Sequence, residues 1–143
     1  DTLVSSSQER ASDTLENVAP ERNYQRLKGI KEWSFGLFEG ESVSLLNATY
    51  DPKFLYGDKI VPFEGESREE VETRVYHTLE KIMQNSNDNT VLAVSHGSTI
   101  GLFIRVILGY DEGSKYDMGN CHIAKFEYDN NEFKFVETID PIV

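Results

Sequence analysis

Cysteine is almost absent from this sequence: Cys121 is the only one among 143 residues. A single cysteine excludes an internal disulfide framework and agrees with the reducing conditions of the cytosol, so we expect a cytoplasmic protein. Long apolar runs are lacking too. The longest, from Ile100 to Leu108, is interrupted by Arg105. It falls short of the roughly 18–20 residues that cross a bilayer, so we expect no membrane partner.

Basic residues are scarce. Lys and Arg number 14 against 25 Asp and Glu, which gives a formal net charge of −11 at pH 7. Nucleic acids and anionic membrane surfaces bind proteins of the opposite charge, so we expect neither as a partner. An anionic substrate would have to be attracted by a locally basic pocket, against the field of the whole chain.

The motifs of common metal, cofactor and nucleophile sites are missing. His77, His96 and His122 have no recognised metal-ligand spacing, and the sequence has no H-E-x-x-H, C-x-x-C, P-loop or G-x-G-x-x-G pattern. We therefore expect neither a metal nor a cofactor. The G-x-S-x-G of a serine nucleophile is absent as well. Ser95 cannot act with its neighbour His96, because successive side chains of a strand point to opposite faces.

The sequence does contain the pattern of a single α/β domain over residues 1–143. A strand is expected at 2–5, and Ser6 with Glu9 predicts the capping box of a helix that Pro20 ends. This helix is expected to bury Ala11, Leu15 and Val18. A second strand is expected within 24–30. The segment 41–64 is long for a connection and rich in aromatic residues, which is typical of a lid-like insert, although the aromatic residues could instead simply cover a face of the core.

The second half continues the alternation of helices and strands. Ser67 and Glu70 predict the capping box of a helix over about 67–84, and a buried strand is expected at 90–95. A helix from about Ser98 to Leu108 follows, with Gly109 as its C-terminal stop. Two alternating segments, 121–128 and 133–137, flank a turn at 129–132. They predict an antiparallel pair at the edge of a mostly parallel sheet.

The segment 90–101 contains the strongest candidate for a functional site. A buried strand ends in Ser95-His96-Gly97 and opens into a helix, and open α/β sheets place their ligands at the carboxyl ends of strands. His96 could be a nucleophile, a proton shuttle or a hydrogen-bonded core histidine. Arg10 falls in the first turn of its helix, where a cation suits a bound anion, but taken alone this position is more typical of a surface arginine.

Four motifs in order resemble the histidine phosphatase superfamily, in particular its phosphoglycerate-mutase-like branch. They are Ser5-Ser6-x-x-x-Arg10-Ala11, Glu32-x-x-x-Gly36-x-x-Glu39-Gly40, Gly65-Glu66-Ser67 with Arg74, and Val94-Ser95-His96-Gly97. The resemblance covers essentially the whole chain. It implies a three-layer α/β/α fold and a small phosphorylated substrate.

The resemblance also implies roles for individual residues. Glu32 would donate a proton to the leaving oxygen, and His96 would be the second histidine, which binds the phosphate and stabilises the transition state. The phosphate would be held further by Arg10, Ser5, Ser6 and the N–H of Gly97. Arg74 would be structural, paired with Glu66 or Glu70.

One part of the family's active site is missing from these residues. The nucleophilic histidine of such proteins lies in Arg-His-Gly at the end of a first strand, and residues 1–143 contain no Arg-His-Gly. We expect the sequence to be part of a longer protein. Alternatively, the sheet is rearranged, or two chains pair as a homodimer through the gap that the first strand would leave.

The resemblance implies a phosphomonoester hydrolase that acts through a phosphohistidine, or a phosphoglycerate-mutase-type phosphoryl transferase. The insert favours the phosphatase, because its acidic and aromatic composition with few cations is a poor cage for a doubly anionic substrate. A non-catalytic phosphate-binding module that has lost its nucleophile is the alternative from another class.

Overall fold

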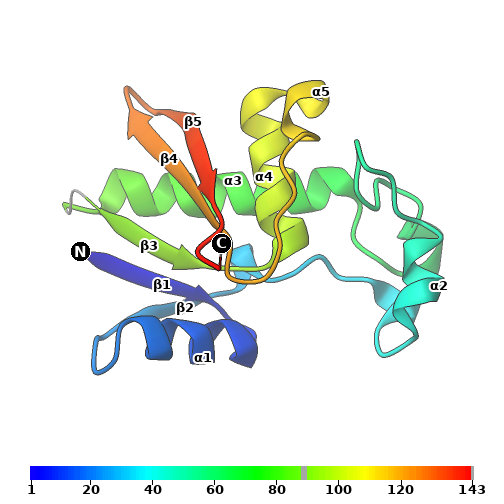
Figure 1. Cartoon of the computed structure of the whole chain (residues 1–143), viewed down its shortest axis with the longest axis horizontal. Coiled ribbons are helices and arrows are strands. Elements are labelled where there is room, and N and C mark those ends of the chain that lie inside the picture. Colours follow the sequence, from blue (N-terminus) through cyan, green and yellow to red (C-terminus); the bar gives the residue numbers. More distant parts are fainter. Residues whose placement is uncertain (88–89, 143) are drawn as a thin grey trace.

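A parallel three-stranded sheet forms the centre of the computed structural model, which describes residues 1–87 and 90–142. Its strands are β1 (Thr2–Ser6), β2 (Gln25–Leu27) and β3 (Val91–Val94), in the order β2-β1-β3 (Figure 1). The register pairs Val4 with Gln25 on one side and with Ala93 on the other. The strand expected at 24–30 is therefore shorter, since residues 28–30 turn into a 3-10 helix, η1 (Lys28–Ile30).

The C-terminal hairpin consists of β4 (Ile123–Asp129) and β5 (Glu132–Ile139). Asn130 and Asn131 make the turn with φ values of 51° and 61°, as the two-residue turn of a twisted hairpin requires. The α/β class, with a parallel sheet and an antiparallel C-terminal pair, is confirmed. The pair is a separate sheet, however, because the structure has no ladder between β4 or β5 and the described strands of the parallel sheet.

Helices lie on both sides of the parallel sheet. Figure 1 shows α1 (Glu9–Val18) on one side and α3 (Arg68–Asn85) on the other. The remaining helices are α2 (Val43–Asn47), α4 (Gly97–Leu108) and α5 (Tyr110–Gly113). The core on the α3 side buries apolar residues of α3, α4 and the loops: Trp33, Leu55, Tyr56, Ile60, Val71, Val75, Leu102 and Phe103.

Helix α1 departs from the sequence prediction at both ends. Its N-cap is Gln8, so the capping box of Ser6 and Glu9 is wrong. Ser6 is still part of β1, and its hydroxyl accepts a hydrogen bond from the main-chain N–H of Gln8 at 3.2 Å. Ala11 and Leu15 are buried as expected, but Val18 is 65% exposed. Val18 is the last residue of the helix, where the chain leaves the sheet surface.

Helix α3 begins as predicted. The hydroxyl of Ser67 accepts a hydrogen bond from the N–H of Glu70 at 3.2 Å, and the Glu70 carboxylate accepts one from the N–H of Ser67 at 2.7 Å. Two N–H groups that the helix leaves without an intrahelical acceptor are thereby satisfied.

Replacing Ser67 by alanine should lower the free energy of unfolding by about 1 kcal/mol, because the Glu70 N–H loses its acceptor. Urea denaturation measures the change. Ser42→Ala is the matched control, since Ser42 is the N-cap of α2 but makes no side-chain capping bond. An equal loss in both variants would contradict a specific capping effect.

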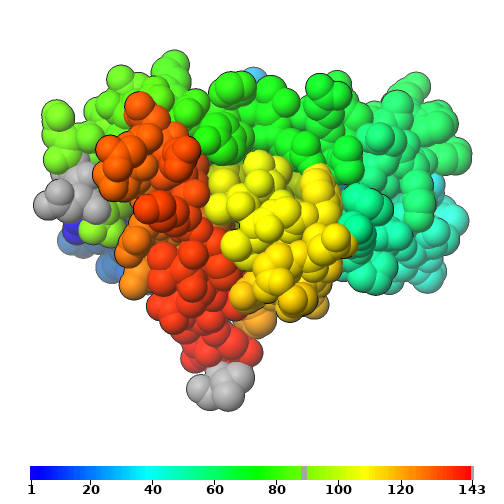
Figure 2. Space-filling model, turned by 90° about the horizontal axis from the view of Figure 1, so that it is seen from above, coloured from blue at the N-terminus to red at the C-terminus, as the bar shows by residue number. Residues whose placement is uncertain are grey.

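The insert 41–64 lies against α4. It contains α2 and a 3-10 helix, η3 (Val61–Phe63), and a second 3-10 helix, η2 (Gly36–Phe38), precedes it. Buried Arg105 of α4 donates hydrogen bonds to the carbonyls of Lys53 at 2.9 Å and Pro52 at 2.7 Å. Figure 2 shows the surface of α4 and α5 between the insert on one side and the C-terminal hairpin on the other. Among helices within residues 1–87 and 90–142, none is both long and apolar enough to span a membrane.

Candidate functional site

Ser6 and His96 meet at the carboxyl ends of two neighbouring parallel strands. The Ser6 hydroxyl and Nε2 of His96 lie 2.8 Å apart, although the residues are far apart in the sequence. The β1–β3 register produces this contact, because it pairs Ser5 with Val94 and so brings the following residues of both strands to the same edge. Both residues are buried, with Ser6 fully inaccessible to solvent and His96 6% exposed.

Burial and nearby cations keep the His96 imidazole neutral. Desolvation, followed by the positive charges of Arg10 and Arg74, lowers the pKa of His96 to about 4. Arg10 is exposed in the first turn of α1, as predicted. Arg10 therefore contributes positive charge beside a neutral histidine. A bound anion would interact favourably with Arg10 and would stabilise the protonated form of His96.

The structure separates the two serines that the sequence places together. Ser5 Oγ lies 3.0 Å from Ser12 Oγ of α1 and donates to the Ser6 carbonyl at 2.9 Å. Adjacent residues of a strand point to opposite faces. Ser5 therefore holds α1 against β1, whereas Ser6 contacts His96.

Glu32 reaches the N-terminus of α4 from the segment after η1. Its Oε1 accepts hydrogen bonds from the N–H of Trp33 at 3.0 Å and from the N–H and hydroxyl of Thr99 at 3.2 and 3.0 Å. Burial raises the pKa of Glu32, and the hydrogen bonds from Trp33, Thr99 and Ser98 offset only part of that effect. A carboxyl group with a raised pKa holds its proton at higher pH, as a general acid must.

Arg74 of α3 holds the segment that carries Glu32. Its guanidinium makes two hydrogen bonds to the Glu66 carboxylate, at 2.8 and 2.9 Å. It also donates to the carbonyls of Gly29, Lys31 and Glu32 at 2.9, 2.9 and 3.1 Å. All N–H groups of the guanidinium thus donate to acceptors within the protein. Arg74 is therefore a structural residue, and its partner is Glu66 rather than Glu70.

Gly97 is the first residue of α4 and lies close to the main chain of Met118. A Cβ atom there would lie 3.0 Å from the carbonyl oxygen of Met118, which is tighter than an ordinary contact. N–H groups of the first helical turn lack intrahelical acceptors and suit a bound anion. Glu32 uses the N–H of Thr99.

Aromatic side chains adjoin Glu32 on the side of the insert. Tyr56 is buried, and its ring makes edge contacts with Trp33, Phe35 and Tyr50 at centroid distances of 5.4, 4.9 and 5.8 Å. Burial raises the pKa of the Tyr56 phenol, a hydrogen bond with Ser98 acts against this, and the charge of Glu32 adds to it. The insert therefore reaches the N-terminus of α4 through Tyr56.

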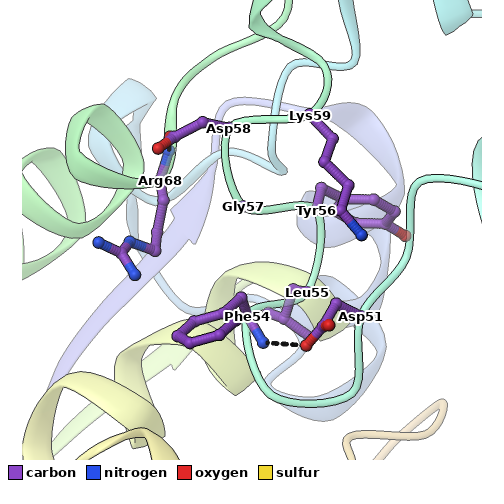
Figure 3. A pocket seen from close by; sticks show the side chains of 8 residues that line it. All are labelled: Asp51, Phe54, Leu55, Tyr56, Gly57, Asp58, Lys59 and Arg68. Atoms are coloured by element: carbon purple, nitrogen blue, oxygen red, sulfur yellow. Dashed lines mark hydrogen bonds between the residues drawn. The ribbon is translucent and has the colours of Figure 1, made fainter.

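A hollow of about 250 Å³ lies between the insert and the start of α3. Figure 3 shows Arg68 on one side of it, Lys59 and Tyr56 together on the other, and Phe54 below. Neither His96 nor Glu32 lines this hollow. Its lining is therefore distinct from the place where Ser6, His96 and Glu32 gather.

Two residues of the site were not anticipated from the sequence. Gln8 accepts a hydrogen bond from the Glu32 N–H through its Oε1 at 2.7 Å, and Thr99 contacts the Glu32 carboxylate. Both stand at the start of a helix, beside residues that the motifs did identify. Their contacts span 24 and 67 residues of sequence, so no local pattern could reveal them.

The other histidines lie apart from these contacts. His77 is a solvated residue of α3, as expected, and its Nδ1 lies 3.7 Å from the Glu80 carboxylate. His122 accepts a hydrogen bond from the Gly119 N–H and lies 3.3 Å from Asp140. Within residues 1–87 and 90–142, no cluster of three His, Cys, Asp or Glu residues is arranged to hold a metal ion.

Comparison with protein families gives one match over nearly the full length. The model of the histidine phosphatase superfamily (branch 1) matches residues 1–141. A curated relative from Salmonella paratyphi A, "Probable phosphoglycerate mutase GpmB", is 28% identical over 97 residues. That alignment covers 66% of this chain and 41% of the relative, so the chain spans about two fifths of the relative's length.

Solved structures with the same fold cover almost the whole chain. YhfR of Bacillus stearothermophilus has a TM-score of 0.76 and 20% identity, and the match covers 94% of this chain and 71% of that one. A mutant phosphoserine phosphatase of Entamoeba histolytica, in complex with phosphoserine, has a TM-score of 0.69 and 26% identity. That match covers 96% of this chain and 73% of the other.

Proposed function

The chain belongs to the histidine phosphatase superfamily (branch 1), and from this premise we propose that it carries the phosphate-binding and proton-donating part of a phosphomonoester phosphatase. The observation that carries the proposal is the gathering of Ser6, His96 and the protonatable Glu32 around the N-terminus of α4. The partners that this chemistry fits are small phosphorylated molecules, not nucleic acid or membranes.

Several residues of the site bind the phosphate group together. Arg10 and the N–H of Gly97 hold the phosphate, and Ser6 and His96 complete the pocket from the strand ends. Phosphate brings negative charge to His96, raises its pKa and makes the imidazole a better donor to the phosphoryl oxygens. Ser5 supports the pocket through its contact with Ser12.

The reaction proceeds in two steps. A histidine nitrogen attacks phosphorus, the ester P–O bond breaks, and the Glu32 carboxyl gives its proton to the leaving oxygen. Water then attacks the phosphohistidine, the P–N bond breaks, and the Glu32 carboxylate accepts the proton of that water. Phosphate and the free histidine result, with Glu32 protonated as at the start.

The nucleophilic histidine is not among the described contacts of this site. We place it on a strand beside β3, because β3 pairs with β1 alone among the described strands. The residues of β3 are half-buried, whereas Leu3 to Ser6 of β1 are buried. A strand in that position would satisfy the free edge of β3 and would end next to His96.

Hydrolysis is favoured over the mutase reaction by the carboxylate partners of lysines in the insert and in the segment that carries Glu32. Lys53 pairs with Asp111, and Lys31 lies 3.8 Å from Glu66. A mutase must retain a doubly anionic intermediate and exclude water from it. Cations that already have carboxylate partners are poorly suited to that task.

Orthovanadate, a mimic of the transferring phosphoryl group, should bind to the 143-residue chain and shift the amide NMR signals of Ser6, Gly97 and Thr99. Arg10→Met should weaken this binding on the order of tenfold or more, because a charge-assisted contact is lost. Arg22→Met is the matched control, since Arg22 is an exposed arginine just beyond the same helix. Binding that is absent, or equal in both variants, would overturn the proposed site.

Turnover separates the enzyme from a phosphate-binding module without catalysis. The chain by itself should bind vanadate but hydrolyse no phosphoester, because His96 is held by Ser6 and neither His77 nor His122 reaches it. A protein that includes the strand beside β3 should form an acid-labile phosphohistidine, detectable by phosphorus NMR. Vanadate binding without a phosphohistidine in that longer protein would favour the module.

A further inference from the structure

The main chain of Glu32 is held from two sides. Its N–H donates to Oε1 of Gln8 at 2.7 Å, and its carbonyl accepts from Arg74 at 3.1 Å. Gln8 belongs to the start of α1 and Arg74 to α3. The backbone at Glu32 therefore cannot rotate freely, and the position of the carboxyl group depends on what holds its oxygens.

The hydrogen bonds that Trp33 and Thr99 make to the Glu32 carboxyl group end on the same oxygen. Oε1 accepts from the Trp33 N–H, the Thr99 N–H and the Thr99 hydroxyl. Donors concentrate negative charge on the oxygen that they contact, so a proton binds more favourably to the other oxygen, Oε2. The two oxygens are thus made unequal by their surroundings.

The Thr99 hydroxyl has two acceptors for one proton. Oγ1 lies 2.9 Å from the Lys31 carbonyl and 3.0 Å from Oε1 of Glu32, and Thr99 is 1% exposed. When Glu32 is ionised, the proton is best directed at Oε1; when Glu32 is neutral, it can turn to the carbonyl. The Thr99 hydroxyl can therefore keep a hydrogen bond both when Glu32 is a neutral acid and when Glu32 is an ionised base.

We infer that Thr99 is a positioning residue for Glu32: its hydroxyl and main-chain N–H hold Oε1, so that the transferable proton is carried by Oε2. The importance of this arrangement for catalysis rests on the proposed function, in which Glu32 protonates the leaving oxygen. The arrangement itself is a property of the chain without substrate.

Other charged and titratable groups lie near Glu32 but do not make the hydrogen bond that the Thr99 hydroxyl makes to its carboxyl group. Tyr56 adjoins it from the insert, Arg74 binds its carbonyl from α3, and His96 precedes the first turn of α4. None of these side chains donates a hydrogen bond to Oε1. Removing the Thr99 hydroxyl therefore removes a donor that no neighbour replaces.

Titration of Glu32 in the 143-residue chain tests the inference. With the glutamate carboxyl carbons labelled with ¹³C and Glu32→Gln used to assign the signal, Thr99→Val should raise the pKa of Glu32 by about one unit, because the ionised form loses a donor. Thr99→Ser keeps the hydroxyl and should leave the pKa near the wild-type value. An unchanged pKa in Thr99→Val would overturn the inference.

Folding of the variants is not expected to confuse the result. Valine has nearly the shape of threonine, and the Lys31 carbonyl retains its hydrogen bond from Arg74 at 2.9 Å. Thr99→Ala provides a second variant without the hydroxyl, and it should raise the pKa in the same direction; a fall or no change would count against the inference.

The position of the proton has its own test. In an atomic-resolution crystal structure below the pKa of Glu32, the Cδ–Oε2 bond should be longer than Cδ–Oε1, and the reverse order would overturn the assignment. Neither measurement uses a phosphoester. If the pKa shifts as expected but vanadate does not bind, the phosphatase proposal fails and the role of Thr99 stands. If vanadate binds but the pKa does not shift, only the inference about Thr99 fails.

Discussion

Replacing Arg74 by methionine is expected to lower the free energy of unfolding by about 2–3 kcal/mol, less than the loss of one partner of a fully buried ion pair, because Arg74 and Glu66 are only partly buried. Burial acts to raise the pKa of Glu66, but hydrogen bonds and charge from Arg74 outweigh it and keep the pKa below its ordinary value. Without Arg74, the Glu66 carboxylate keeps the Ser34 N–H at 2.8 Å and the more distant Lys31. Urea denaturation measures the change.

A second substitution shows where the loss in Arg74→Met arises. Adding Glu66→Gln to Arg74→Met should recover part of the stability, because it removes the uncompensated charge and keeps an oxygen for the Ser34 N–H. Arg22→Met, at an exposed position, should change the stability by less than about 0.5 kcal/mol. If Arg74→Met were as mild as Arg22→Met, the network would not hold the segment around Glu32.

Lowering the pH should destabilise the chain through His96. In the folded chain its pKa is about 4, against 6.5 for an unperturbed histidine, so the unfolded state binds more protons between these values. Stability is therefore lost as the pH falls from about 6.5 through 4, by about 3 kcal/mol in total, and His96 adds no further loss well below its folded pKa. Denaturation midpoints at a series of pH values measure this slope.

The variant His96→Gln isolates the contribution of His96. Glutamine does not titrate and can keep a hydrogen bond to Ser6, so the difference in pH slope between wild type and variant belongs to His96. Glu66, with its lowered pKa, also loses stability as the pH falls through its folded value, whereas Glu32, with its raised pKa, acts in the opposite direction. A slope that persists unchanged in His96→Gln would contradict the expected titration of a buried neutral imidazole.

Helix α3, helix α4 and the C-terminal hairpin could be predicted well, because their signals are local. A capping box, an apolar stripe and a pair of asparagines each act within a few residues. The start of α1 was predicted wrongly for a physical reason. Ser6 fits a capping box in sequence, but pairing of β1 with β2 keeps Ser6 extended, and its hydroxyl contacts Gln8 and His96 instead.

The candidate site shows the same division. Its motif residues Arg10, Glu32 and His96 were found in the sequence, while Gln8 and Thr99 were not. A motif shows which residue types occur in a segment, but it does not show which side chains of other helices and strands contact them in the fold. Glu32 is an acid with a raised pKa because folding buries it against α4, and nothing within its own segment dictates that burial.

The Ser95-His96-Gly97 motif and its helix are thus features of the sequence, since a strand end and a helix start are encoded by neighbouring residues. The partner of His96, the neutrality of its ring and the oxygen of Glu32 that carries the proton all depend on the fold. They follow from the register of β1 on β3 and the contact of Thr99 with Glu32. Burial and long-range hydrogen bonds determine proton affinity, and both exist only once distant segments have packed together.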